Sequence, residues 1–217
     1  MPKLRSVTWL KISGMCGLLT PIVAFSCIFL AIYFAPEFSW THNALSDLGV
    51  MPGVTAALFN YGLIGSGVLS LIFATSLPSV VSLLEVSSAD GQSRVIPHRG
   101  HVGALFFLSA CIALTAIGVF PEDAKPMHFI ASVAFFVLLI CALLSLGIGF
   151  WQLKQKQWAA FTLLFGAVAA APWLLLLVVR YVSGVAIPEF IAAVAGGLWA
   201  AIFGFKMLQL ASRAKAA

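Results

Sequence analysis

Long apolar stretches, separated by short polar segments, dominate the pattern of hydrophobic and polar positions along the chain. Each stretch holds about 20 mostly apolar residues, the length an α-helix needs to cross the hydrocarbon core of a bilayer. The stretches lack the alternation typical of barrel strands, and helices satisfy their own backbone hydrogen bonds in lipid. The pattern therefore predicts six transmembrane helices, at about 14–35, 54–77, 102–120, 127–150, 158–179 and 188–210. Pro172 predicts a kink near the middle of the fifth helix.

The composition supports a membrane protein. Of the 217 residues, 62% are hydrophobic and 9% are charged, whereas soluble domains are close to half apolar and about a quarter charged. All four cysteines lie in apolar stretches and none belongs to a CxxC pair, so no disulfide framework is expected. Because the linkers are short, we expect residues 1–217 to form a single all-α domain, a polytopic six-transmembrane-helix bundle.

Lysine and arginine residues are divided unevenly between the two predicted ends of the bundle. Since basic residues favour cytoplasmic loops, we expect both termini in the cytoplasm, with the protein in a bacterial inner membrane or archaeal cell membrane. The first stretch exceeds the length of a signal-peptide core, so we expect it to remain as a helix. Topology explains the net charge of +5, and no nucleic-acid binding is expected. One end holds Lys3, Arg5, Lys11, Arg94, Arg99, Lys154, Lys156, Lys206, Arg213 and Lys215, and the other holds Lys125 and Arg180.

The segment "THNALSDLGV", residues 41–50, places several polar side chains directly after the first apolar stretch. If residues 42–48 form a helical turn, Asn43, Ser46 and Asp47 share one face. Asn43 or Ser46 would then cap the turn, and Gly49 would end it. The segment is therefore interpreted either as a structural turn at the outer membrane face or as part of a functional site there.

Other ionisable residues are predicted at the same outer face. His128 follows the segment "GVFPEDAKP", Arg180 ends the fifth stretch, and Glu189 opens the sixth. Charged groups at membrane depth are costly and usually pair or serve a function. We therefore expect Arg180 to pair with Asp47 or Glu189, and we assign Asn43, Arg180 and Glu189 as candidate binding residues.

Three kinds of chemistry are compatible with these residues. A nucleophilic site would use Ser46, His128 and an acid, which makes Ser46, Asp47 and His128 candidate catalytic residues. A metal site would draw on His42, Asp47 and His128, although no metal-binding motif such as HExxH occurs. A proton relay would use Asp47 and His128. The sequence identifies no cofactor and no protein partner.

The chain resembles a family of uncharacterised six-helix membrane proteins found in archaea and bacteria and known as a domain of unknown function. The most specific segments are "SDLG" at residues 46–49 and "FP" at 120–121 followed by His128, and the resemblance covers nearly the whole chain. It implies a six-helix fold and a membrane location. It implies no reaction.

A looser similarity links the chain to multi-helix membrane hydrolases, such as alkaline ceramidases and adiponectin-receptor-like proteins. Those proteins carry a serine, an aspartate and three histidines around zinc, and Ser46, Asp47 and His128 are comparable with part of that set. The chain departs from the pattern because it lacks a His-x-x-x-His pair near its end. We expect a membrane protein that binds lipid or a small molecule. Two alternatives remain: a lipid-modifying hydrolase, with or without a metal, that uses Asp47 and His128, and a small proton-coupled transporter.

Overall fold

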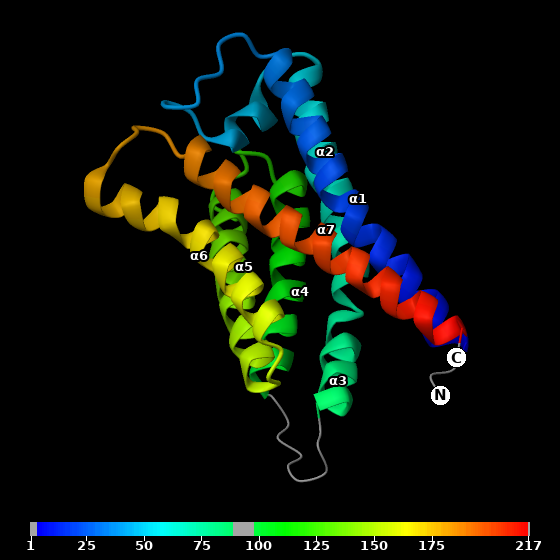
Figure 1. Ribbon diagram of the computed structural model, residues 1–217. Helices are drawn as coiled ribbons and strands as arrows, with labels where there is room; N and C mark the ends of the chain where they lie inside the picture. Colours follow the sequence, from blue (N-terminus) through cyan, green and yellow to red (C-terminus); the bar gives the residue numbers. More distant parts are fainter. Residues whose placement is uncertain (1–3, 89–97, 217) are drawn as a thin grey trace.

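The computed structural model describes residues 4–88 and 98–216, and all its regular secondary structure is helical (Figure 1). Lys3 and Arg94, two of the basic residues counted above, lie outside the described residues. The helices are α1 (Leu4–Tyr33), η1 (Leu45–Val50, a 3-10 helix), α2 (Val54–Ala74), α3 (Leu77–Ser88), α4 (His98–Val119), α5 (Met127–Gln152), α6 (Lys156–Val179) and α7 (Ala186–Ala216).

Six segments within the described residues are long and apolar enough to cross a membrane, which confirms the predicted all-α, six-helix architecture. The protein is therefore a multi-pass membrane protein. Four of the predicted spans agree with the observed helices to within a few residues at each boundary. The first helix differs, because it begins at Leu4 rather than near residue 14 and so includes the basic N-terminal segment.

The second predicted span, 54–77, covers α2 and ends at the start of α3, and one candidate membrane span runs from Val54 to Ser82 across the turn between the two helices. Thr75 and Ser76 form this turn, and Pro78 lies in the first turn of α3. Proline is tolerated at this position, because backbone N–H groups in the first turn have no acceptor within the helix. The turn is tied to α1 by two hydrogen bonds. Ser76 Oγ donates to Ser13 Oγ at 2.7 Å, and Trp9 Nε1 donates to Thr75 Oγ1 at 3.1 Å.

The six long helices contact one another in a closed ring, in the order α1, α2, α4, α5, α6 and α7. The largest side chains inside the ring are aromatic and fully buried. Trp199 of α7 stacks on Phe203 with ring centroids 5.0 Å apart, and it meets Phe73 of α2 edge-on at 6.1 Å. Such aromatic packing joins helices that are distant in sequence into one core.

Glycines allow two of these helix pairs to approach closely. A Cβ atom on Gly149 of α5 would lie 2.6 Å from the Cα atom of Gly100 of α4, and one on Gly14 of α1 would lie 2.8 Å from the carbonyl oxygen of Gly204 of α7. Any side chain at these positions would push the helices apart. Small residues at contacts of this kind let helices pack by van der Waals attraction in lipid.

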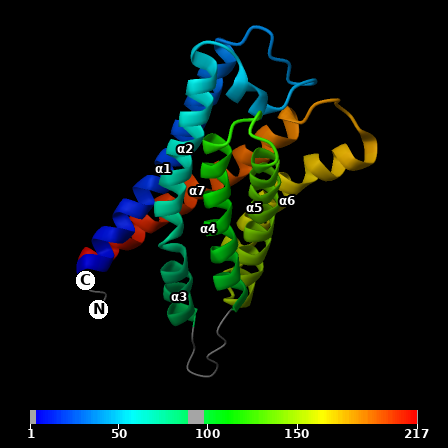
Figure 2. The same cartoon turned by 180° about the vertical axis from the view of Figure 1, so that it is seen from behind.

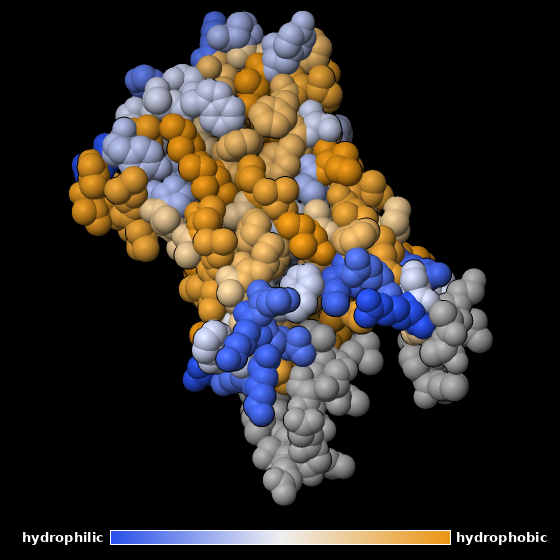
Figure 3. Space-filling model, viewed as in Figure 1, coloured by the Kyte–Doolittle hydropathy of each residue, from blue (hydrophilic) through white to orange (hydrophobic). Residues whose placement is uncertain are grey.

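The two ends of the bundle differ in character. Both termini lie at one end, together with α3, while η1 and the loops beside it lie at the other (Figures 1 and 2). Apolar surface occupies the middle of the molecule, and strongly hydrophilic residues gather at the terminal end (Figure 3). We call the opposite end, which holds the predicted polar segment, the η1 end.

Candidate functional site

The polar segment before η1 is fastened to the loop that connects α6 and α7. The carbonyl oxygen of Thr41 accepts hydrogen bonds from the backbone N–H groups of Ser183 and Gly184, at 3.1 and 2.8 Å. The carbonyl oxygen of Asn43 accepts from Val185 and Ala186, at 3.1 and 2.9 Å. These four bonds join segments about 140 residues apart and place η1 against the start of α7.

Asp47 holds the start of η1 together. Its Oδ2 atom accepts hydrogen bonds from the backbone N–H of Ala44 at 3.0 Å and from the side-chain amide of Asn43 at 2.7 Å. The amide oxygen of Asn43 accepts in turn from the backbone N–H of Ser39 at 2.9 Å. A carboxylate that satisfies the free N–H groups at a helix start is a capping residue. The interpretation of this segment as a structural turn therefore applies to Asn43 and Asp47.

The sequence suggested that Gly49 ends the short helix, but the structure shows that it does not. It lies inside η1, which continues to Val50, and the glycine with positive φ is Gly53, at 75°. Gly49 instead allows close packing, because a Cβ atom there would lie 2.6 Å from the side-chain oxygen of Asn60. Asn60 in turn donates its amide N–H to the Gly49 carbonyl at 2.9 Å, which joins η1 to α2.

Glu189 lies in the first turn of α7 and is only 7% exposed. Its Oε2 atom accepts a hydrogen bond from the backbone N–H of Leu45, at 2.6 Å. The carboxylates of Glu122 and Asp47 lie close enough to act on it electrostatically. The bond to Leu45 is a second connection between η1 and α7, made by a side chain that also faces a cavity, as described below.

His128 is 4% exposed and has fixed partners on both ring nitrogens. Its Nδ1 atom lies 2.7 Å from the carbonyl oxygen of Phe120. Its Nε2 atom lies 2.7 Å from Oε2 of Glu122 and 3.2 Å from the hydroxyl of Ser132. Because a carbonyl oxygen only accepts hydrogen bonds, Nδ1 carries a proton and donates it to the Phe120 carbonyl. The short contact between Nε2 and the Glu122 carboxylate then requires a second proton, carried either by the imidazole or by the carboxyl group. The pair is neutral overall whichever partner carries that proton.

A groove of about 670 Å³ lies beside these polar groups. Its polar end is formed by side chains from η1, the α4–α5 loop, α5 and α7, and its apolar wall by side chains of α5 and α6. The polar lining residues are Ser46, Glu122, Lys125, His128, Ser132 and Glu189, and the larger apolar ones are Phe129, Val133, Phe136, Val137, Ile140 and Trp173. We call this cavity the lateral groove.

The second half of α6 leaves the lateral groove open at one side. α6 runs beside α5 in its first half and turns away from it in its second half (Figures 1 and 2). Pro172 lies in the second half of α6, and the kink expected from this proline stays a prediction. Leu177 and Val178, beyond the proline, are among the most exposed apolar side chains of the chain. The groove therefore opens between transmembrane helices, toward the surface that faces lipid.

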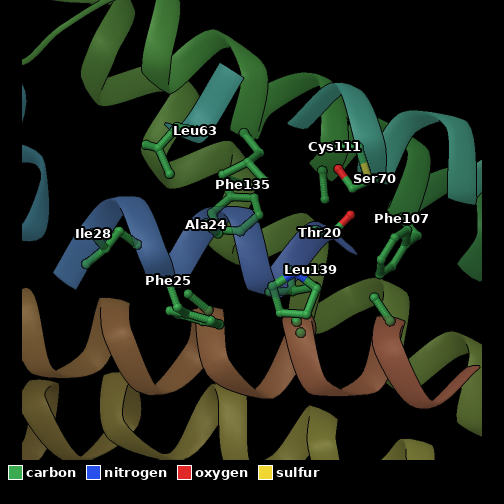
Figure 4. Close-up of a pocket in the computed structure, with 17 residues that line it drawn as sticks. Thr20, Ala24, Phe25, Ile28, Leu63, Ser70, Phe107, Cys111, Phe135 and Leu139 are labelled. Atoms are coloured by element: carbon green, nitrogen blue, oxygen red, sulfur yellow. The ribbon is translucent and has the colours of Figure 1, made fainter. Parts of the chain in front are cut away.

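A smaller internal cavity of about 70 Å³ lies in the centre of the helix ring (Figure 4). Thr20 and Ser70 are polar residues in its lining, and each hydroxyl donates to a carbonyl of its own helix, at 2.9 and 2.8 Å. A narrow cavity of about 50 Å³ shares Ser46, Ser132 and Glu189 with the lateral groove and shares Ile28 and Phe135 with the internal cavity. The ionisable lining residues Glu122, Lys125, His128 and Glu189 thus belong to the lateral groove, and the linings of the two smaller cavities are mostly apolar.

The structure brings together only part of the predicted site. Ser46, His128 and Glu189 all line the lateral groove. Asn43 and Asp47 lie next to it, in the cap of η1. Arg180 and His42 do not line the groove.

The expected ion pair of Arg180 with Asp47 or Glu189 is wrong. Arg180 is exposed at the end of α6, in a left-handed backbone conformation with φ of 47°. It forms no ion pair with any residue that the structure describes. Asp47 and Glu189 accept hydrogen bonds from backbone and amide N–H groups instead.

The residues do not form a serine-type catalytic triad. In such a triad the nucleophilic hydroxyl and the orienting acid lie on opposite nitrogens of the histidine. Here Nδ1 of His128 is occupied by the Phe120 carbonyl, and the hydroxyl of Ser132 and the carboxylate of Glu122 share Nε2. Asp47 is used by the η1 cap, and Ser46 makes no hydrogen bond to His128.

The proposed metal ligands are not assembled either. His42 is exposed, and its Nδ1 atom lies 2.9 Å from the hydroxyl of Thr41 and 3.0 Å from that of Ser39. Within residues 4–88 and 98–216, no three histidine, cysteine, aspartate or glutamate side chains are grouped so that they could hold one metal ion. The donor set His42, Asp47 and His128 is therefore not one site.

Sequence reasoning missed two groove residues, Ser132 and Trp173. Ser132 lies four residues after His128, a spacing that places both on one helix face, so its position was available in the sequence. No signal in the sequence pointed to Trp173, which lines the groove in contact with Phe136 of α5, with 4.9 Å between the two ring centroids. Its indole Nε1 is buried and has no hydrogen-bond partner in the described structure.

Comparison with known proteins places this architecture in a family. Residues 18–206 match the family model described as "Protein of unknown function (DUF998)". The chain belongs to the DUF998 family. No curated protein and no solved structure matches the chain.

In this DUF998 protein, the two segments that carried the family resemblance have clear structural roles. The segment Ser46–Gly49 forms most of η1, with Asp47 as its cap and Ser46 facing the lateral groove. The two ends of the segment from Phe120 to His128 are joined by the hydrogen bond between the His128 ring and the Phe120 carbonyl, which fixes the orientation of the ring. Both segments therefore build the polar end of the groove.

Proposed function

We propose that the protein binds a membrane lipid, or a lipid-like small molecule, in the lateral groove. The polar group of the ligand lies among Glu122, His128 and Glu189, and its apolar part lies along α5 and α6. The observation that carries this proposal is that a buried polar end and an apolar wall belong to one groove of about 670 Å³ that opens between transmembrane helices. Pockets for organic ligands combine mostly apolar walls with a few convergent polar groups in the same way.

The length of the apolar wall supports a ligand from one membrane leaflet. Phe129 and Ile140 mark its two ends on α5, and a helical rise of 1.5 Å per residue puts these residues about 16 Å apart. This is about half of the roughly 30 Å of a bilayer hydrocarbon core. A single acyl or prenyl chain would therefore fit along the wall while its head reaches the polar end.

The charge distribution supports an orientation with the η1 end outside the cytoplasm. Lys11, Arg99, Lys154, Lys156, Lys206 and Arg213 lie in helices or loops of the terminal end, whereas Lys125 and Arg180 lie at the η1 end. By the positive-inside rule, both termini are cytoplasmic and the groove receives lipid from the outer leaflet of a bacterial or archaeal plasma membrane. Fusions to the C-terminus test this orientation. If the C-terminus is cytoplasmic, a fused alkaline phosphatase should be inactive and a fused green fluorescent protein should fluoresce.

Lipid retention during purification tests the binding proposal. The full-length protein is extracted in a mild detergent, and native mass spectrometry measures the fraction that carries a lipid. Val137→Trp fills the groove, whereas Ile130→Trp is its matched control, because Ile130 lies on the same helix and is 56% exposed against 53% for Val137 but does not line the groove. We expect bound lipid to fall at least fivefold in Val137→Trp and to stay unchanged in Ile130→Trp.

Equal lipid retention in both variants would contradict the proposal, because only the tryptophan at residue 137 lies in the groove. Loss of lipid in both variants would also contradict the proposal, since it would show that the lipid binds around α5 without preference for the groove. Only selective loss in Val137→Trp supports a specific site. Thermal unfolding of both variants in the same detergent checks that the folded fraction is equal.

The hydrolase and transporter alternatives receive less support from the geometry. A hydrolase using Asp47 and His128 would need both side chains in the groove, but the Asp47 carboxylate is taken by the backbone and amide groups at the start of η1. A proton-coupled carrier would be expected to place charged groups near the bilayer midplane. The groove's ionisable side chains lie instead at the η1 end of α5 and α7, and in the loop before α5.

A further inference from the structure

Glu189 is a buried carboxylate that has no cationic partner among the residues the structure describes. It is 7% exposed, and its single hydrogen bond is the one that Oε2 accepts from Leu45. An ionised carboxylate removed from water is strongly unfavourable unless a counter-charge or several donors compensate it. The inner wall of the lateral groove therefore has an unused capacity to bind a positive charge.

The neighbouring charged groups do not supply that charge. Glu122 is neutralised by His128, as the short contact at Nε2 requires, and Asp47 is engaged by Asn43 and Ala44. Lys125 also lines the groove, but it is exposed and pairs with no described carboxylate. Any cation that meets Glu189 must therefore come from the molecule that occupies the groove.

The surroundings of Glu189 are suited to an ammonium group. Ser46 is 6% exposed and lines the same groove, and its hydroxyl has no hydrogen-bond partner among the described residues. An ammonium group carries three N–H donors, and the free carboxylate oxygen and the Ser46 hydroxyl are two acceptors for them. The rings of Phe136 and Trp173, 4.9 Å apart between centroids, line the same groove and offer faces that attract cations.

We infer that the ligand of the lateral groove is an amphiphile whose headgroup carries a positively charged amine, held by Glu189 and Ser46. This inference rests on the proposed function and names the ligand class of that site. Lys125 at the rim fits the phosphate of a zwitterionic aminophospholipid. The buried Nε1–H of Trp173 fits an ester or phosphate oxygen of the ligand, since it can only donate.

Titrations with defined lipids test the inference on the delipidated full-length protein. Native mass spectrometry compares dioleoyl phosphatidylethanolamine with dioleoyl phosphatidylglycerol, which share their chains and differ in the amine. A second comparison uses hexadecylamine against hexadecanol, and so asks whether the amine suffices without a phosphate. We expect the amine of each pair to bind at least tenfold more tightly.

Glu189→Gln removes the charge while keeping an oxygen for the Leu45 N–H. Asp123→Asn is its matched control, because Asp123 is an exposed acid in the α4–α5 loop that does not line the groove, and its substitution changes the net charge equally. We expect Glu189→Gln to lose the preference for amines, and Asp123→Asn to keep it. If Glu189→Gln does not fold, the two wild-type comparisons decide the question alone.

The results separate this inference from the proposed function. If Val137→Trp blocks all four ligands but wild-type protein binds amine and non-amine ligands equally, the ammonium site is overturned and the groove remains a lipid site. If Val137→Trp blocks none of them, the proposed function fails as well. A preference for phosphatidylethanolamine without one for hexadecylamine would restrict the ligand class to aminophospholipids, and the inference would hold for that class.

Discussion

Nε2 of His128 lies 2.7 Å from Oε2 of Glu122, while Nδ1 of the same ring donates to the Phe120 carbonyl. The histidine thus joins the end of α4, the following loop and the start of α5. Because the His128–Glu122 pair is neutral as a unit, Glu189 is the buried carboxyl group of the groove that has no charged partner among the described residues. The contact between these two residues therefore determines both how the loop is held and where a ligand's charge is needed.

His128→Ala should destabilise the protein markedly. The change removes the hydrogen bond to the Phe120 carbonyl, which typically contributes about 0.5–1.5 kcal/mol, and it also opens a cavity where the buried ring was. Glu122→Gln should have a smaller effect, because this side chain is partly exposed and glutamine still offers a hydrogen-bonding group. Chemical denaturation in mixed micelles measures both. Equal stability of His128→Ala and wild type would show that the histidine does not hold the loop.

Asp47→Ala and Ser46→Ala, at adjacent positions, should separate structure from ligand binding. Asp47→Ala removes the cap of η1, a loss of about 0.5–2 kcal/mol, and should lower the unfolding temperature. Ser46→Ala removes a hydroxyl that bonds to no described residue, so stability should change by less than about 0.5 kcal/mol. Lipid binding, measured by native mass spectrometry, should weaken in Ser46→Ala. A stable Asp47→Ala protein would refute the capping role.

Gly184→Val should loosen the polar segment from the α6–α7 loop. A Cβ atom at residue 184 would lie 2.7 Å from the backbone nitrogen of Asn43, so the two backbones would have to separate. Hydrogen exchange should then become faster at Ser183 and at Val185, whose N–H groups bond to the segment. Gly65→Val is the comparison, since the nearest atom to a Cβ there is 3.7 Å away. Similar exchange in the two variants would argue against the docking.

Arg180→Gln should leave stability within about 0.5 kcal/mol of the wild type, as is usual for surface substitutions. The arginine is exposed and makes no ion pair with a described residue, so no buried charge loses a partner. Thermal unfolding over a range of salt concentrations provides the measurement. A large loss of stability at low salt would revive the ion-pair network that the sequence had suggested.

The polar segment shows how far local pattern reasoning reaches. The spacing of Asn43, Ser46 and Asp47 suggested a helical turn over residues 42–48 capped by Asn43 or Ser46. The structure has a 3-10 helix at Leu45–Val50 instead, and Asp47 rather than Asn43 or Ser46 satisfies the N–H at its start. The exact turn, its 3-10 character and the packing role of Gly49 followed from contacts with Asn60 and Glu189, which lie on α2 and α7. Those contacts join residues far apart in sequence, so no local pattern encodes them.

The break between α2 and α3 illustrates the same limit. The apolar run to residue 77 continued across it, and the polar pair Thr75 and Ser76 became a turn because Trp9 and Ser13 of α1 supply hydrogen-bond partners. Trp173 entered the groove for a similar reason, since it lies on α6 and packs against Phe136 of α5.

The sequence alone determined that this protein has six membrane-spanning helices, roughly where they lie, and that polar groups gather at one end. These properties depend on helix length and on the cost of polar backbone in lipid, and both can be read from consecutive residues. Only the tertiary structure decided which polar groups satisfy one another and which face the groove. That selection depends on burial and on pairing between helices, so the same carboxylate type caps a helix as Asp47 and faces a lipid groove as Glu189.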